Sequence, residues 1–267
     1  MNHHRQTFDG LAAFANFSAD TGGKGRDASE WNGNATLADA CGLASHGWQD
    51  GCAKINTTLA SLENDIGSLA VVPSIRRVDD GGEIDVAAYL TGEPEHWVMP
   101  EQTMAVSECG RALTIGFCCT VSGVVSADEL TRRGAAVAAL IASLELGGYA
   151  VKLDVILSTS SRPREKGHTA VAVVPVKNFG GEIDVATLAF TCAHPAFLRQ
   201  LGFVFYQHAA DEHGCGTGYD NGYGYPYTPE LEGYDLIIPA LHTGTWDTEQ
   251  TAAWLTEQWQ ALGIVEE

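Results

Sequence analysis

A strand–helix–strand pattern in the middle of the chain limits the fold more than any other feature of the sequence. Ala112–Val121 is apolar and rich in β-prone residues, which is typical of a strand buried on both faces. Ser126 and Glu129 have the spacing of a capping box and predict a helix start, and apolar residues then recur with helical periodicity. Val151–Ser158 follows as a second strand. Two strands joined by a helix in this way form a parallel pair, so the sequence predicts a right-handed βαβ unit.

Further strands and helices are predicted on both sides of this unit along the chain. Apolar, β-prone runs predict strands at Thr169–Lys177, Phe203–Gln207 and Tyr234–Leu241. Caps and helical periodicity predict one helix that starts near Thr36 and ends at Gly47, and others at Gly51–Ile66, Val185–Thr191, His194–Leu201 and Thr248–Leu262. This alternation predicts an α/β fold with three layers and a mostly parallel sheet, of the Rossmann type or a degenerate form of the von Willebrand A type.

Composition divides the chain into two parts. Residues 1–30 are rich in glycine and short polar side chains, with Thr21–Ser29 as the clearest loop, and they are predicted to form a flexible N-terminal segment. Residues 31–267 are predicted to form a single α/β domain. The heptapeptide GGEIDVA occurs twice, and each copy predicts a helix that starts with an aspartate, Asp85 or Asp184, as its N-cap.

Cysteine usage and hydropathy indicate a protein of the cytoplasm. Seven cysteines are present, none of them in a Cys-x-x-Cys pair, and the adjacent Cys118 and Cys119 lie in an apolar run. Such cysteines usually behave as small buried hydrophobic residues, and reduced thiols are favoured over a disulfide framework. The first ten residues lack the apolar stretch of a signal peptide, and no apolar run is long enough for a membrane span. We therefore expect no membrane association.

The net charge restricts how the chain can bind nucleic acid. Asp and Glu number 34 against 15 Lys and Arg, which gives a formal charge of −19. The acidic C-terminal quarter, residues 200–267, contains 11 Asp and Glu and no Lys or Arg. This quarter must repel polyanions, so nucleic acid can bind only at a local basic surface elsewhere, and its binding should weaken with salt.

Seven cations and two tyrosines are the candidate residues for such a surface. Three of the cations share one loop between two predicted strands, where together they favour contact with phosphate. The glycine-rich segment 214–227 carries tyrosines whose rings can stack on bases. Each charge alone is more typical of a solvated side chain, and the tyrosines alone are more typical of a loop that packs on the surface. The candidate DNA-binding residues are Arg162, Arg164, Lys166, Arg132, Arg133, Lys24, Arg26, Tyr223 and Tyr225.

No pattern in the sequence indicates catalysis or a cofactor. The turn Thr120–Ser126 lies where Rossmann-type and von Willebrand A-type folds bind ligands, but threonine at position 120 leaves a metal-adhesion site without its carboxylate. Nucleotide-binding glycine motifs and a Gly-x-Ser-x-Gly elbow are absent. One cluster of metal-capable residues is present but matches no zinc spacing: His208, Asp211, Glu212, His213 and Cys215. We therefore predict no enzyme activity, no cofactor and no bound metal.

Several short segments resemble a family of bacteriophage proteins. They lie between residues 31 and 240 and read Trp31-Asn32-Gly33, Gly47-Trp48, Gly51, Asp85-Val86, Tyr89-Leu90, Gly92-Glu93-Pro94, Arg133-Gly134-Ala135-Ala136, His194-Pro195 and Phe197-Leu198-Arg199. The family is that of the single-stranded-DNA-binding RNA polymerase cofactor (Drc) of podoviruses. The resemblance implies a non-enzymatic factor that binds single-stranded DNA at opened promoters and recruits a phage RNA polymerase to middle genes, in the cytoplasm of the host cell.

Three functional hypotheses follow. In the first, the chain is such a transcription cofactor: cations capture the DNA backbone, tyrosines stack on bases, the acidic quarter meets a basic polymerase surface, and self-association lines several basic faces along one strand. In the second, it is a protein-binding module with a degenerate von Willebrand A-like fold that uses the turn at Ser122 and the tyrosine-rich loop. In the third, it is a metal-dependent hydrolase that uses His208, Asp211 and His213.

Overall fold

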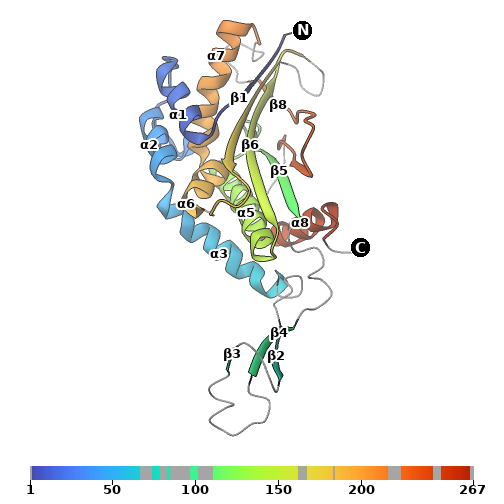
Figure 1. Ribbon diagram of the computed structural model, residues 1–267. Helices are drawn as coiled ribbons and strands as arrows, with labels where there is room; N and C mark the ends of the chain where they lie inside the picture. Colours follow the sequence, from blue (N-terminus) through green and yellow to red (C-terminus); the bar gives the residue numbers. More distant parts are fainter. Residues whose placement is uncertain are drawn as a thin grey trace.

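A computed structural model of the chain describes residues 2–66, 74–78, 83–84, 97–101, 111–161, 167–182, 184–215, 224–242 and 248–264. Within these residues, six strands form a central sheet in the order β1-β7-β6-β5-β9, with β8 paired to β6 beside this path (Figure 1). The strands are β1 (His3–Thr7), β5 (Ala112–Cys118), β6 (Ala150–Ser160), β7 (Thr169–Lys177), β8 (Tyr225–Pro226) and β9 (Leu236–Ile238).

The predicted βαβ unit is confirmed. Strands β5 and β6 pair in parallel and are joined by α5 (Ala127–Leu146). Ser126 caps this helix: its hydroxyl accepts from the backbone N–H of Glu129, and the Glu129 carboxylate accepts in return from the backbone N–H of Ser126. Strand β9 also pairs in parallel with β5, and β1 with β7, whereas β6 and β7 are antiparallel. The sheet is therefore mixed and mostly parallel, as the sequence predicts.

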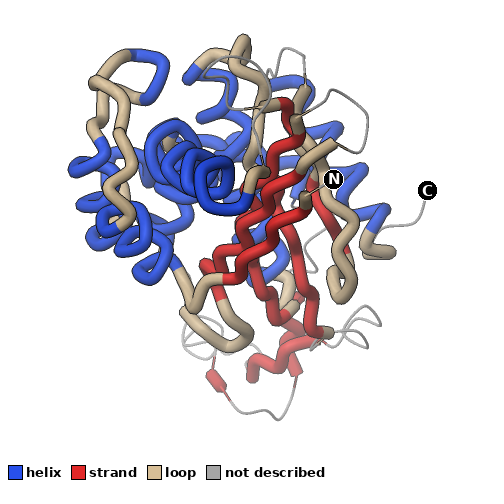
Figure 2. Tube along the Cα trace, turned by 90° about the horizontal axis from the view of Figure 1, so that it is seen from above, coloured by secondary structure: helices blue, strands red, loops and turns tan. Residues whose placement is uncertain are grey.

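Helices pack around the sheet (Figure 2) and close one continuous hydrophobic core on one of its faces. Alternate residues of β5, such as Leu113, Ile115 and Phe117, point into this core because successive strand residues face opposite sides. The longer helices are α1 (Leu11–Asp20), α2 (Leu37–His46), α3 (Gln49–Ile66), α5, α7 (Phe203–His213) and α8 (Thr248–Ala261). Shorter helical turns are η1 (Glu30–Asn32), α6 (Val185–Leu188), η3 (Ala189–Ala193) and η4 (Phe197–Gly202). None of the described helices is long and apolar enough to cross a membrane.

The other face of the sheet is covered by the chain segment that runs from β8 to the end of β9. Cys118, Ile156 and Val173 form a second, smaller cluster on this face, and Tyr227 and Tyr234 pack against it. The Tyr234 hydroxyl donates to Asp154 in the middle of β6, at 2.8 Å. In the described residues this face is therefore covered by irregular chain of the acidic C-terminal quarter, whose Tyr227 and Tyr234 rings pack against the sheet.

Two sequence predictions about secondary structure are wrong. Phe203–Gln207 is helical and begins α7, where a strand is predicted. Short apolar runs do not distinguish a buried helix from a buried strand, and Phe203 to Tyr206 are all buried. Residues 3–20 are also ordered, in β1 and α1, where a flexible segment is predicted. The polar sequence of β1 does not predict a strand, because an edge strand needs little apolar surface. Phe8 and Phe14, which follow β1, are buried in the core and hold the segment in place.

A second sheet lies in the insertion between α3 and β5. It contains β2 (Ser74–Val78), β3 (Glu83–Ile84) and β4 (Trp97–Glu101), paired antiparallel in the order β2-β4-β3. In Figure 1 these strands lie apart from the six-stranded sheet. The predicted helix start at Asp85 lies outside the described residues. Its counterpart is confirmed: the Asp184 carboxylate caps α6 by accepting from the backbone N–H groups of Ala186 and Thr187 at 3.0 and 3.1 Å.

The described cysteines are free thiols, as predicted. Cys118, Cys119 and Cys192 are buried, and burial raises the pKa of each thiol. These three side chains therefore stay protonated at neutral pH and act as small hydrophobic groups rather than as nucleophiles.

Acid is expected to destabilise the fold through His194. This residue is buried against Trp48, with ring centroids 4.6 Å apart, and its Nδ1 accepts from the backbone N–H of Ala196 at 3.0 Å. Burial lowers the pKa of His194 to about 4, and the charge of Lys54 adds to the effect. An unfolded histidine titrates near pH 6.5, so between these values only the unfolded state takes up the proton, and stability falls as the pH drops from about 6.5 towards 4.

We expect the free energy of unfolding to be about 2 kcal/mol lower at pH 5 than at pH 8 because of this group. Urea unfolding of His194→Gln at both pH values should show that difference removed, whereas His46→Gln, at an exposed histidine of α2, should retain it. An equal pH dependence in both variants would contradict this assignment.

Candidate functional site

A pocket with a volume of about 110 Å³ lies where β5 ends and the chain turns towards α5. Thr120, Val121 and Gly123 of this turn form one wall. The turn follows the carboxyl end of a parallel strand, which is where α/β folds bind ligands. The structure therefore places a pocket at the turn that sequence analysis identifies as the ligand-binding position of this fold class.

Aromatic side chains form much of the pocket wall: Trp31, Phe203, Tyr206 and Tyr225. The rings of Trp31 and Phe203 lie 5.6 Å apart, and the Trp31 indole N–H donates to the carbonyl of Gly123 at 3.2 Å. Tyr206 is held by a buried network: its hydroxyl donates to the carbonyl of Ser158 at 3.2 Å and lies 3.0 Å from the hydroxyl of Thr120. These bonds fix the wall, so the pocket is formed before any ligand arrives.

Arg199 of η4 contributes a buried positive charge to the same pocket. Its side chain is almost fully enclosed, since the residue is 1% exposed. The guanidinium donates to the carbonyls of Trp31 and Val125 and lies 4.3 Å from the centre of the Trp31 ring. Burial lowers the pKa of Arg199 to about 10, so it remains a cation at neutral pH. Among the described residues, no carboxylate pairs with it.

Three of the predicted DNA-binding residues lie at or near this pocket. Tyr225 lines it. Arg26 lies with its guanidinium 5.7 Å from the Trp31 ring and 5.9 Å from the Phe203 ring, while Gln200 holds its backbone through two hydrogen bonds of 2.8 Å. Lys24 is exposed two residues earlier in the same loop. Sequence segments far apart thus converge on one site.

Other predicted residues do not join the pocket or fall outside the described part of the chain. Arg132 is exposed on α5; hydrogen bonds from Ser126 lower the pKa of Glu129, and the charge of Arg132 adds to that effect. The predicted loop and tyrosine residues Arg162, Arg164, Lys166 and Tyr223 lie outside the described residues. The base of that loop is described: Ser160, two residues before position 162, pairs with Tyr225.

The assignment of Arg133 as a DNA contact is wrong. The residue is 4% exposed and packs over the Phe117 ring at 4.9 Å. Its guanidinium donates to the carbonyls of Cys118, at the end of β5, and Pro239, which follows β9. Arg133 therefore ties two strand ends together inside the protein, because its position on α5 faces the sheet rather than the solvent.

The metal-binding hypothesis receives no support from the described residues. No group of three or more His, Cys, Asp or Glu side chains among them is arranged to hold a metal ion. The rings of His213 and His4 stack at 3.9 Å, and the ring of His208 lies 5.9 Å from that of His213. Asp211 and Glu212 are exposed on the last turn of α7. The cluster seen in the sequence is thus a histidine stack beside two solvated acids.

Trp31, Arg199, Phe203 and Tyr206 are site residues that the sequence patterns do not identify. Trp31 and Arg199 both occur in the segments that carry the family resemblance, but nothing in those segments shows that the two side chains meet. Phe203 and Tyr206 fall in the run interpreted as a strand. The signal that could have drawn attention to this site is an arginine inside a largely apolar run, residues 185–206, that contains no Asp or Glu.

The fold and site define a class: an α/β protein whose mostly parallel sheet carries a small aromatic and cationic pocket at the carboxyl end of a strand. The chain belongs to the family described as domain of unknown function DUF7192, whose model matches residues 1–266. Searches of curated proteins and of solved structures gave no match.

Proposed function

We propose that the protein binds single-stranded DNA across the mouth of this pocket and acts as a cofactor that recruits a phage RNA polymerase to opened promoters. The observation that carries the DNA-binding part is the convergence of Arg26 and Arg199 on the aromatic wall at Trp31 and Tyr225, in a chain of charge −19. Proteins that bind single strands combine cations along the backbone with aromatic platforms for bases.

Each part of the site has a role in this proposal. Trp31 and Tyr225 are partly exposed, and in this proposal bases stack on the exposed parts of their rings. Lys24 and Arg26, both exposed, contact phosphates near the pocket. Arg162, Arg164 and Lys166 lie outside the described residues and stay candidate phosphate contacts. In this proposal Lys24 and Arg26 supply positive charge beside the aromatic wall.

Recruitment of the polymerase rests on the family resemblance and on charge. Exposed acids of the C-terminal quarter, among them Glu230, Glu232 and Asp235, lie in the segment around β9 that covers the second face of the sheet. An acidic surface attracts a basic partner and increases the rate of encounter. In this proposal the polymerase meets the acidic segment, and further copies of the chain bind along the same strand of DNA.

Removing the two loop cations should weaken DNA binding and reduce its dependence on salt. Lys24→Ala/Arg26→Ala is expected to lower the slope of log affinity against log salt by about 1.4, because each phosphate contact on a single strand contributes about 0.7. Fluorescence anisotropy with a labelled oligothymidylate measures that slope between about 25 and about 200 mM salt. Arg5→Ala, at an exposed arginine of the edge strand β1, is the matched control and should retain it.

The proposal fails if the wild-type protein does not bind the oligonucleotide at low salt. If the protein binds but the double variant keeps the wild-type slope, Lys24 and Arg26 do not contact the phosphates and the strand takes another path.

One observation favours protein binding as a second candidate function. Val124, in the turn beside the pocket, is 83% exposed, so its apolar side chain is available for contact with a partner protein. In a protein-binding module the Val124 side chain would pack into an apolar pocket of the partner protein. This function would be supported by two results together: the wild-type protein does not bind the oligonucleotide, and Val124→Asp loses binding to a purified polymerase.

A further inference from the structure

The buried charge of Arg199 is not balanced within the described protein. A guanidinium has five N–H donors, and two carbonyls, those of Trp31 and Val125, accept from it. The face of the Trp31 ring provides further stabilisation of the cation. A buried cation is nevertheless unfavourable unless an opposite charge accompanies it. Arg199 lines the pocket, so a bound anion could supply that charge.

The backbone at Arg199 also indicates a functional site. Arg199 lies on η4, a π-helical turn, and such turns are frequent at functional sites. The buried charge, the π-helical turn and the pocket therefore coincide at one place.

The size of the pocket limits which anion fits. Its volume is about 110 Å³, whereas a cavity of about 150 Å³ accepts a molecule of benzene. One phosphate group fits this space, but a whole nucleotide does not. A phosphate within a DNA strand carries a sugar on each side and cannot enter, whereas a terminal phosphate monoester has only one substituent and carries more negative charge.

We propose that this pocket binds the terminal phosphate of a single DNA strand, with Arg199 as its charged ligand. This inference rests on the proposed function and adds a specificity to it: the protein recognises strand ends that carry a phosphate. The first base then lies at the mouth of the pocket, where Tyr225 and Trp31 can stack on it. No covalent step is involved.

Binding of matched ligands tests the proposal. Anisotropy competition should compare oligothymidylates that carry a 5′-phosphate, a 3′-phosphate or hydroxyls at both ends, and calorimetry should compare thymidine 5′-monophosphate with thymidine. We expect at least one phosphorylated end to improve affinity about ten-fold, the effect of one or two charge-assisted hydrogen bonds. The 5′ and 3′ oligonucleotides decide which end is bound.

Three variants separate phosphate binding from stability. Arg199→Gln should remove the preference for phosphorylated ends; because it also removes structural bonds, thermal unfolding must show that the variant is folded. Gly123→Val adds a branched side chain at a residue that lines the pocket, where a Cβ meets nothing within 4 Å, so it should hinder entry of the phosphate and leave the hydrogen bonds of Arg199 in place. Arg133→Gln, at a buried arginine outside the pocket wall, is the matched control and should keep the preference.

The possible outcomes distinguish this inference from the proposed function. Equal affinity for phosphorylated and hydroxyl-ended strands overturns the inference and leaves single-strand binding intact. Absence of binding to every oligonucleotide, with thymidine monophosphate still bound through Arg199, would keep the phosphate pocket and overturn the proposed function. A preference that survives both Arg199→Gln and Gly123→Val would place the phosphate elsewhere and overturn the inference.

Discussion

Gly134→Ala is expected to destabilise the protein by at least about 3 kcal/mol. Gly134 lies on α5 where this helix packs against η3, and a Cβ there would lie 2.0 Å from the carbonyl oxygen of Cys192 and 2.4 Å from the Cα of Ala193. These are backbone atoms, so no side-chain rotation can relieve the overlap and the two helices must separate. Urea unfolding followed by circular dichroism measures the loss.

A second glycine provides the control for this substitution. Gly42 lies inside α2, where a Cβ meets nothing within 4 Å, so Gly42→Ala should gain about 0.5 to 1 kcal/mol from the higher helix propensity of alanine. The two variants make the same chemical change and should shift stability in opposite directions. A loss below about 1 kcal/mol for Gly134→Ala would mean that α5 and η3 are less closely packed than described.

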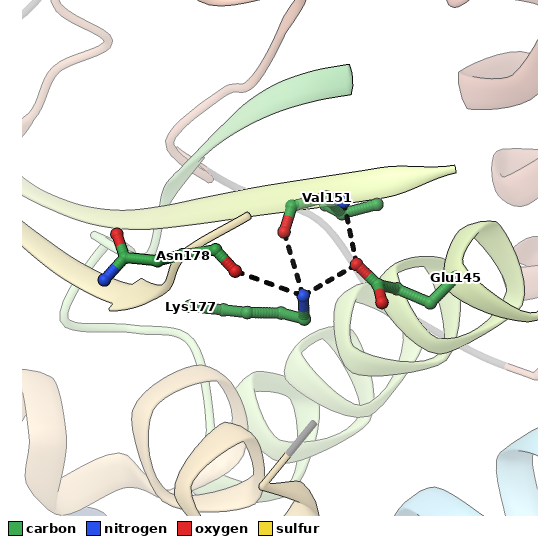
Figure 3. Close-up of polar contacts among 4 residues, drawn as sticks. All are labelled: Glu145, Val151, Lys177 and Asn178. Atoms are coloured by element: carbon green, nitrogen blue, oxygen red, sulfur yellow. Dashed lines mark hydrogen bonds and ion pairs between the residues drawn. The ribbon is translucent and has the colours of Figure 1, made fainter. Parts of the chain in front are cut away.

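Lys177→Met is expected to cost about 3 kcal/mol, because it removes one partner of an ion pair that is largely buried. The Lys177 ammonium, 3% exposed, lies 2.6 Å from the Glu145 carboxylate and donates to the carbonyls of Val151 and Asn178 (Figure 3). Glu145 also accepts from the backbone N–H of Val151 at 2.7 Å. The pair thus connects the end of α5, the start of β6 and the end of β7.

A double variant tests whether charge or packing dominates. In Lys177→Met the Glu145 carboxylate, 23% exposed, loses its cation, whereas Glu145→Gln/Lys177→Met leaves no unpaired charge. Glutamine can still accept from Val151, so the double variant should be more stable than Lys177→Met by about 1 kcal/mol or more. If the double variant is less stable than Lys177→Met, the unpaired carboxylate is not the source of the loss. Unfolding in urea at pH 7 gives both values.

The sequence predicts the elements whose signals are local. The cap at Ser126 with the apolar positions that follow it predicts α5, and the apolar run before it predicts β5. Asp184 predicts the start of α6 in the same way. Each depends on residues within a few positions of one another, because capping bonds and helical or strand periodicity act over that distance.

The wrong predictions concern segments and side chains whose secondary structure or burial depends on what packs against them. The run that begins at Phe203 suits either a strand or a helix, and it becomes α7 because it continues the helical chain of η4. Strand β1 is polar and forms only because β7 offers a free edge for parallel pairing. The charged side chain of Arg133 is buried because the carbonyls of Cys118 and Pro239 meet at its position on α5.

The candidate site shows the same division. Lys24, Arg26 and Tyr225 are identified from residue type and loop composition alone, and they lie at or near one pocket. That Trp31 and Arg199 stack against each other, 168 positions apart in the chain, follows from no local pattern. Their contact forms only when η1 and η4 pack beside the turn after β5.

The sequence by itself determined the α/β class, the βαβ unit and a set of cations confined to the chain before residue 200. Those properties follow from periodicity, capping and composition, which act along the chain. Only the tertiary structure decided which cations are buried, which face solvent and where an aromatic wall surrounds one of them. Burial and electrostatic balance depend on neighbours that come from distant segments of the chain, so they are determined only when the chain folds.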